Sequence, residues 1–232
     1  MVTIVLVTPR NPLNIGAAAR AMSNFGFFDL RLVNPYRVAF DEARSGVNAD
    51  KVLTDAREFA TVAEAVADCY LIVGTSALGP REVPLPCHTL EAAGRKLRKV
   101  TGRVAVLFGS EKFGLSNDDI SYCHWLLRIP TRGEHRSMNL GQAVAVTLYE
   151  LIRNGRADAT PGPAPTVASA DAEGRVFELL LSALEGSGYI KPPVDASQTL
   201  KLRRLIRRMG LSDKDAISWQ GMLRQISWKM KQ

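Results

Sequence analysis

Five short runs of aliphatic residues punctuate the first part of the chain, at residues 3–7, 29–34, 68–73, 104–108 and 125–129. Strands that are buried on both faces of a parallel sheet have such unbroken apolar runs. Stretches with helical spacing and polar loops separate the runs. This alternation predicts an α/β fold, with a mostly parallel sheet and helices on both of its faces.

The first helix is predicted at residues 14–26. Asn14 is the expected N-cap and Gly26 the expected end, because asparagine caps helices well and glycine tolerates the left-handed backbone that ends them. Residues 34–46 are expected to form a loop. Further helices are predicted at residues 49–59, 61–67, 91–99 and from 140 onward.

Beyond Ile152 the composition changes, because residues 154–170 combine several prolines with many small residues, as linkers do. Helical patterns return at 175–184 and 200–209, and one or two more helices are expected within 212–228. We therefore predict a first domain, a linker and a small helical tail. Their predicted bounds are residues 1–155, 156–170 and 171–232.

The helix at 200–209 has an apolar stripe and a face with four arginines: Arg203, Arg204, Arg207 and Arg208. This face is either an ordinary solvated surface or a contact with a nucleic-acid backbone. The net charge of +7 favours anionic partners such as nucleic acid. The pattern alone leaves both interpretations open.

Three cysteines without a CxxC pair, and three isolated histidines, favour neither a disulfide framework nor a metal site. We expect no secretory leader, because the first residues have no positively charged segment and no small-residue cleavage site, and no apolar run approaches the roughly 20 residues that cross a membrane. A cytoplasmic protein without a metal or a membrane contact is therefore expected.

The loops that follow the strands are the expected ligand site, since α/β sheets bind ligands beyond the carboxyl ends of their strands. Residues 109–116, GSEKFGLS, superficially match a phosphate loop. However, Leu115 and Ser116 replace the Lys-Ser/Thr of that motif, and no GxGxxG follows the first strand. An enzyme that binds nucleotide phosphates is thus disfavoured.

Three ordered segments are more specific together than any one of them: NIGAAARAM at 14–22, FGSEKFGLSN at 108–117 and IPTRGEHRSMNLGQAVAV at 129–146. Together they resemble the SpoU/TrmH class of SPOUT methyltransferases over residues 1–155. With TSALGPRE at 75–82 and the tail at 203–228, the chain is most similar to TrmJ-type tRNA (cytidine/uridine) 2′-O-methyltransferases.

The resemblance implies a C-terminal trefoil knot, S-adenosylmethionine as cofactor, and a homodimer whose arginine faces the partner's cofactor. It implies a cofactor site at Thr75, Ser76, Ala77, Gly109, Ile129, Arg136, Ser137, Met138, Asn139 and Leu140. The catalytic residues implied are Asn14, Arg20, Glu111, Ser137 and Asn139.

The implied reaction is methyl transfer to a ribose 2′-hydroxyl of tRNA, at the pyrimidine of anticodon-loop position 32. TSALGPRE, where relatives are richer in arginine, and the charged segment 129–139 depart from the usual pattern. Both could change RNA preference. The alternatives are the same reaction on ribosomal RNA, or an RNA-binding protein of this fold without turnover.

Overall fold

The computed structural model describes residues 1–45, 51–77, 85–132, 134, 137–153, 167–191 and 195–230. Within these ranges the strands form one sheet in the order β3-β2-β1-β6-β4-β7-β5, and every neighbouring pair is parallel. The strands are β1 (Val2–Val7), β2 (Asp29–Val33), β3 (Arg57–Phe59), β4 (Leu71–Thr75), β5 (Cys87–Thr89), β6 (Val104–Phe108) and β7 (Trp125–Arg128).

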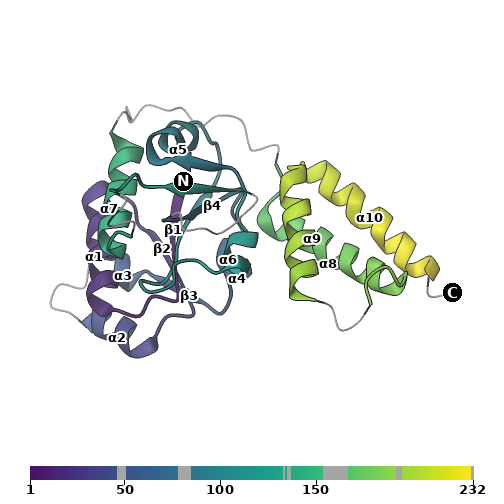
Figure 1. Ribbon diagram of the computed structural model, residues 1–232, viewed down its shortest axis with the longest axis horizontal. Helices are drawn as coiled ribbons and strands as arrows, with labels where there is room; N and C mark the ends of the chain where they lie inside the picture. Colours follow the sequence, from purple (N-terminus) through teal and green to yellow (C-terminus); the bar gives the residue numbers. More distant parts are fainter. Residues whose placement is uncertain are drawn as a thin grey trace.

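Helices cover both faces of this sheet (Figure 1). One face packs against α1 (Pro12–Phe25), α2 (Arg37–Ser45), α3 (Lys51–Thr54), α5 (Leu90–Leu97) and α7 (Leu140–Ile152). The other face packs against α4 (Val62–Val66) and α6 (Asn117–Ser121). The predicted parallel α/β fold is thereby confirmed, whereas the trefoil knot stays a prediction.

Alternation along the strands explains why the runs are apolar throughout. Ile4 and Leu6 of β1 belong to the core beneath α1 and α7, whereas Val5 and Val7 belong to the core beneath α4 and α6. Each central strand thus faces two hydrophobic cores, as expected for a sheet that is covered on both sides.

The first helix begins earlier than the sequence predicted. Asn11 is its N-cap, with a side chain that accepts a 2.9 Å hydrogen bond from the Leu13 amide, and Pro12 occupies the first turn. Proline suits that position because its fixed φ is helical and its missing N–H would be unpaired there. The prediction that Asn14 caps the helix is wrong, and its side chain bonds elsewhere. Gly26 ends the helix with φ +77°, as predicted.

Two predictions for the segment after β2 are also wrong. Helix α2 forms within the expected loop, because Phe40 is completely buried in the core that α1 covers. The expected helix at 49–59 is divided into α3 and the strand β3, where Arg57 pairs with Arg31 of β2. Pairing at the sheet edge thus overrides local helical preference. The short edge strand β5 was not predicted.

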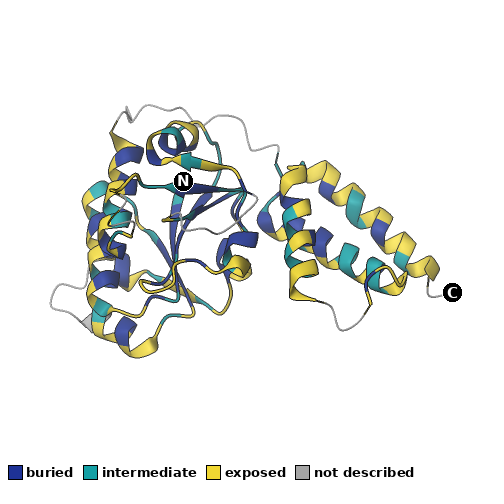
Figure 2. Ribbon diagram, viewed as in Figure 1, coloured by how far each residue is buried: buried dark blue, intermediate teal, exposed yellow. Residues whose placement is uncertain are grey.

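The last part of the chain forms three helices, α8 (Ala170–Gly186), α9 (Ala196–Met209) and α10 (Asp213–Met230), within the described residues. They share a hydrophobic cluster that includes Val176, Ile206 and Leu223. The outer surface of α10 is largely exposed (Figure 2). We call these three helices the helical extension. The domain bounds at 155 and 170 stay a prediction.

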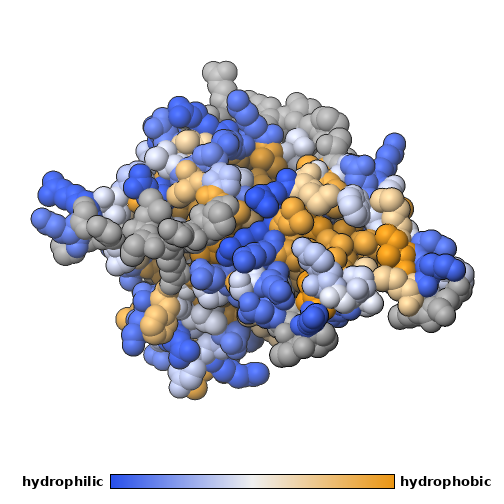
Figure 3. All heavy atoms as spheres, turned by 45° about the vertical axis from the view of Figure 1, so that its right-hand side comes forward, coloured by the Kyte–Doolittle hydropathy of each residue, from blue (hydrophilic) through white to orange (hydrophobic). Residues whose placement is uncertain are grey.

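The helical extension also carries exposed apolar side chains, which gather on the face that comes forward in Figure 3. The exposed apolar side chains of α10 include Ile217, Met222, Ile226 and Trp228. No helix of the described residues is long and apolar enough to cross a membrane.

The four arginines on the basic face of α9 differ in exposure, and a nucleic-acid contact by this face stays a prediction. The Arg207 side chain is buried against Glu173, and the Arg203 side chain is only 15% exposed. Arg208 is exposed. Arg203 and Arg207 therefore stabilise the fold, because they form ion pairs with Asp118 and Glu173.

Candidate active site

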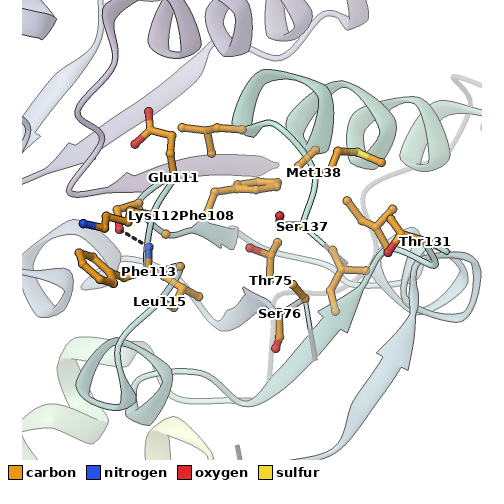
Figure 4. A pocket seen from close by; sticks show the side chains of 18 of the residues that line it. Thr75, Ser76, Phe108, Glu111, Lys112, Phe113, Leu115, Thr131, Ser137 and Met138 are labelled. Atoms are coloured by element: carbon orange, nitrogen blue, oxygen red, sulfur yellow. Dashed lines mark hydrogen bonds between the residues drawn. The ribbon is translucent and has the colours of Figure 1, made fainter. Parts of the chain in front are cut away.

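A cavity of about 340 Å³ lies at the carboxyl ends of β4, β6 and β7 (Figure 4). This is the edge at which α/β sheets bind ligands. Most of the predicted cofactor residues line the cavity: Thr75, Ser76, Ala77, Gly109, Ile129, Ser137, Met138 and Leu140. The structure therefore brings together three loops that are far apart in the sequence.

The loop after β6 folds back on itself to form one wall of the cavity. The Gly114 amide donates a 2.8 Å hydrogen bond to the Ser110 carbonyl, and Gly114 has φ +66°. A Cβ atom at Gly109 would overlap the backbone of Gly114 and Leu115. Glycine at 109 is thus required by close approach, and at 114 by the left-handed backbone.

The loop after β4 forms another wall and is fixed to neighbouring strands. The Thr75 hydroxyl donates a 2.9 Å hydrogen bond to the Leu107 carbonyl, and the Ser76 amide donates one of 2.9 Å to the Leu127 carbonyl. These bonds tie β4 to β6 and β7 where the strands open onto the cavity. Loop residues on a rigid sheet edge can position a ligand well.

A chain of side-chain hydrogen bonds joins three of the predicted catalytic residues. The Asn139 Nδ2 donates to the Asn14 Oδ1 at 2.7 Å, and the Asn14 Nδ2 donates to the Glu111 Oε1 at 3.0 Å. Glu111 also accepts from the backbone amides of Arg10 and Asn11, at 3.3 and 3.2 Å. The cavity loop is thereby fastened to the starts of α1 and α7.

Close packing of α1 against α7 makes this chain possible. A Cβ atom at Gly141 would lie 2.6 Å from the Ala17 Cβ, so only glycine allows the helices to approach this closely. Asn139 is the N-cap of α7, and its Oδ1 accepts a 3.3 Å hydrogen bond from the Gln142 amide. Its Nδ2 is therefore directed toward α1.

The hydrogen bonds also set the charge of Glu111. Partial burial would raise the pKa of this carboxyl, but the bonds from Asn14 and from the backbone outweigh burial and lower the pKa below its ordinary value. Glu111 is therefore ionised at neutral pH, and it is a weaker base than an ordinary glutamate.

The remaining predicted residues lie in different places. Arg20 is exposed on α1 and does not line the cavity. Asn139 does not line the cavity either, although it is bonded to Asn14. Ser137 lines it and is exposed. Arg136, predicted to bind the cofactor, lies outside the described residues.

Several lining residues were not predicted individually: Phe108, Ser110, Lys112, Phe113, Leu115, Ile120, Leu127, Thr131 and Ala143. Most belong to the ends of predicted strands or to GSEKFGLS, the segment rejected as a phosphate loop. Lys112 places its Nζ 5.1 Å from the ring centroid of Phe113, which is itself largely exposed. The sequence signal that could have indicated these residues is an aromatic residue, Phe113, in a loop with Gly109 and Gly114.

The cavity combines apolar walls with a few hydroxyls, the carboxylate of Glu111 and the ammonium of Lys112, a composition typical of small-ligand sites. Among the described residues, no group of three or more His, Cys, Asp or Glu could hold a metal ion. The fold and site thus define a parallel α/β protein with a ligand pocket at the carboxyl edge of its sheet.

Comparison with known proteins specifies the family. Residues 1–149 match the model of the SpoU rRNA Methylase family, and the chain belongs to this family. It is 33% identical to the tRNA (cytidine/uridine-2'-O-)-methyltransferase TrmJ of Sodalis glossinidius (strain morsitans), over 99% of this chain and 92% of that relative. The resemblance recognised in the sequence is confirmed.

Solved structures agree. The crystal structure of TrmJ from Z. mobilis ZM4 matches with a TM-score of 0.85 and 35% identity, over 97% of this chain and 99% of that one. A structure described as giving insights into the 2-OH methylation of C/U34 on tRNA matches with a TM-score of 0.52 and 28% identity. It covers 66% of this chain and 95% of that one.

Proposed function

We propose that the protein is an S-adenosylmethionine-dependent methyltransferase that modifies a ribose 2′-hydroxyl of tRNA in the cytoplasm. The observation that carries this proposal is the hydrogen-bonded chain Asn139–Asn14–Glu111 beside the sheet-edge cavity. Similarity to TrmJ proteins along nearly the whole chain supports the substrate class.

The cavity residues fit this cofactor. The cavity volume of about 340 Å³ lies within the range of small-ligand pockets. Phe108, Leu127 and Ile129 offer apolar surface to a purine ring, whereas the Thr75–Ser76 segment and Ser137 offer polar groups to its edges and to a ribose. When bound, S-adenosylmethionine supplies a methyl group on a positively charged sulfur.

The protein's own residues would bind and orient the reactants, and positioning supplies much of the rate in such a displacement. The lowered pKa of Glu111 makes it a poor general base. Its role in this proposal is therefore to fix the cavity loop. Asn14 and Asn139 hold Glu111 in place, and Ser137 contacts the nucleotide. The proton of the attacking hydroxyl can leave to water at the exposed cavity mouth.

Arg20 has a different task in this proposal. A guanidinium holds its proton too tightly to act as a base. It is suited to bind the target phosphate and to stabilise negative charge that develops on oxygen. Because Arg20 is exposed and does not line its own protomer's cavity, we place it against the cavity of a second protomer.

A homodimer therefore forms part of the proposal. Exposed apolar side chains lie on α1 and α7, the two helices that the Asn139–Asn14 hydrogen bond joins. They are Leu13 of α1, and Val146, Tyr149 and Ile152 of α7. Burial of such side chains against the same surface of a second copy is the usual basis of a two-fold dimer.

Within tRNA, the proposed target is the pyrimidine at position 32 of the anticodon loop. One structural relative is described with C/U34, so position 34 is the nearest competing site. The test is transfer of labelled methyl groups to tRNA transcripts, in which position 32 or 34 is replaced in turn by a 2′-deoxynucleotide. Label that disappears only with the position 32 substitution supports the proposal.

Arg20→Ala should abolish transfer while the protein still binds S-adenosylmethionine. Calorimetric titration with this cofactor and with ATP provides the control. Binding of ATP alone would contradict the proposal. Binding of the cofactor without transfer to any RNA would favour an RNA-binding protein without turnover.

A mixing experiment tests whether the site is shared between protomers. Arg20→Ala and a variant with a blocked cavity, Ala77→Trp, are each expected to be inactive. If Arg20 acts on the partner's cavity, mixed dimers contain one intact site, and an equal mixture recovers about a quarter of wild-type activity. No recovery from subunits that have been shown to exchange would place Arg20 in its own protomer's site.

Ribosomal RNA is the second candidate substrate, because the family model is described by rRNA methylation. Parallel assays with bulk tRNA and ribosomal RNA, followed by nucleoside analysis, separate the two. A 2′-O-methylated nucleoside in ribosomal RNA alone would keep the chemistry and change the substrate.

A further inference from the structure

Arg203 of α9 makes three contacts with the α/β part of the chain and a fourth with α8. Its Nη1 donates hydrogen bonds of 2.8 Å to the Asp118 Oδ1 and of 2.8 Å to the Ser121 Oγ. Its Cζ lies 4.1 Å from the ring centroid of Tyr122 and 5.2 Å from that of Phe177. The guanidinium therefore joins α6 and its C-cap to α8 and α9.

Helix α6 is the element between Arg203 and the cavity. It has five residues, too few for a helix that is stable on its own, so its position depends on caps and tertiary contacts. Ser116 caps its start by accepting a 3.1 Å hydrogen bond from the Asp119 amide. Ser116 is also the residue at which the cavity loop ends.

The two sides of α6 have different neighbours. Asp118 and Ser121 bind Arg203, whereas Ile120 is buried and lines the cavity. Leu115, just before the cap, is also buried and lines the cavity. A movement of α6 would therefore displace part of the cavity wall and the end of its loop.

We infer that Arg203 is a positioning residue for cofactor binding: by fixing α6 from the helical extension, it holds Leu115 and Ile120 in the shape that the cofactor requires. This inference rests on the proposed function, since it takes S-adenosylmethionine as the ligand. It assigns the helical extension a role in the cofactor site in addition to any contact with RNA.

The side-chain chemistry makes arginine specific at this position. A planar guanidinium can stack between two aromatic rings and still donate in its own plane to Asp118 and Ser121. Lysine retains the charge and its ammonium has several N–H donors, but it has no planar face to stack on the aromatic rings while it donates to Asp118 and Ser121. Methionine retains the length and the apolar packing but neither the charge nor the donors.

The test measures S-adenosylmethionine binding by calorimetry, and KM and kcat with tRNA, at a temperature well below the melting of every variant. Arg203→Met should weaken cofactor binding and raise the cofactor KM by about tenfold, with kcat at saturating cofactor changed less than threefold. Arg203→Lys should lie between Arg203→Met and wild type. Arg208→Met, on the exposed side of the same helix, is the matched control and should bind like wild type.

A second variant tests the route through α6. Asp118→Asn should raise the cofactor KM by a smaller factor, and its combination with Arg203→Met should add little, because both changes disrupt one contact. Additive effects would contradict a shared route.

The outcomes separate the inference from the proposed function. If Arg203→Met lowers the melting temperature but leaves the cofactor KM within twofold of wild type, Arg203 stabilises the fold only, and the inference is wrong. If wild type binds no S-adenosylmethionine, the proposed function fails and the inference fails with it.

Discussion

Asn14 and Glu111 are 97 positions apart in the chain, yet the Asn14 side-chain amide donates a 3.0 Å hydrogen bond to the Glu111 carboxylate. This bond joins the first turns of α1 to the loop after β6. It also keeps the carboxylate ionised, because donors to a carboxylate favour its charged form. Several expected outcomes depend on this and on other long-range contacts.

Replacing Glu111 by glutamine should impair the site more than the fold. The new NH₂ group would face the Asn14 Nδ2 or the amides of Arg10 and Asn11, so a donor would meet a donor. A hydrogen bond to a charged group contributes about 1.5–3 kcal/mol, so methyl transfer should fall by roughly 10- to 100-fold. Steady-state rates with tRNA measure this.

Glu64→Gln is a suitable control, because Glu64 accepts similar backbone hydrogen bonds at the start of α4 and does not line the cavity. It should alter stability slightly and activity hardly at all. Equal losses of activity in both variants would show that Glu111 acts only through stability.

Gly109→Ala should disrupt cofactor binding, because its Cβ would overlap the backbone of Gly114 and Leu115 and force the loop open. We expect at least a tenfold weaker affinity for S-adenosylmethionine, measured by calorimetry. Gly221→Ala, on the exposed side of α10 with open space around its Cβ, should instead stabilise the protein by about 0.5–1 kcal/mol. Unchanged affinity in Gly109→Ala would mean that the loop does not form the ligand wall.

His124 should make stability depend on pH. Burial, and then the charge of Arg207, lower the pKa of His124 to about 3, whereas an unfolded histidine titrates near 6.5. The unfolded state therefore binds a proton that the folded state does not. Stability is full above about pH 6.5 and falls by roughly 1.4 kcal/mol per pH unit as pH drops toward 3. Denaturant unfolding at pH 7, 6 and 5 measures the slope.

His124→Asn should flatten this slope between pH 7 and 5. Asparagine can place an acceptor oxygen where the His124 Nδ1 accepts a 3.0 Å hydrogen bond from the Ile72 amide, but it does not titrate. His88→Asn, at a partly exposed edge strand, is the control. Burial and then the charge of Lys96 lower the pKa of His88 too, but most of the wild-type slope should remain in this variant. A steep slope that persists in His124→Asn would assign the pH dependence to other groups.

The buried pair of Glu173 and Arg207 should show a large cost when one partner is lost. Both side chains are almost completely enclosed, at 1% and 5% exposure. Glu173→Gln leaves the Arg207 charge buried without its counter-ion, and should lower the free energy of unfolding by about 3–5 kcal/mol. Denaturant midpoints measure this.

The double variant Glu173→Leu with Arg207→Met should be much closer to wild type, since neither buried charge remains. The Glu173 Oε1 already lacks a hydrogen-bond partner among the described residues, so the pair is not ideally satisfied. A double variant as unstable as the single one would show that the pair contributes net stability.

Local sequence was sufficient for the features that depend on neighbours in the chain. The five central strands, the end of α1 at Gly26 and the helices at 61–67 and 91–99 follow from apolar runs, spacing and caps. The positions of the candidate site residues came from a resemblance of three ordered segments. The resemblance could locate these residues because the three segments contain unusual combinations of glycine, asparagine and charged residues.

Only the tertiary structure decided which residues meet. Asn11 followed by Pro12 is a local pattern for the cap of α1. No local pattern indicates that Asn14 bonds Glu111 and Asn139, because these partners come from distant loops. A helical wheel places Arg208 about 140° around the helix from Arg203. It does not show that Arg203 is stacked on Tyr122 and bonded to α6 while Arg208 stays exposed. Side-chain periodicity specifies a face of a helix, whereas packing between distant segments determines what covers that face.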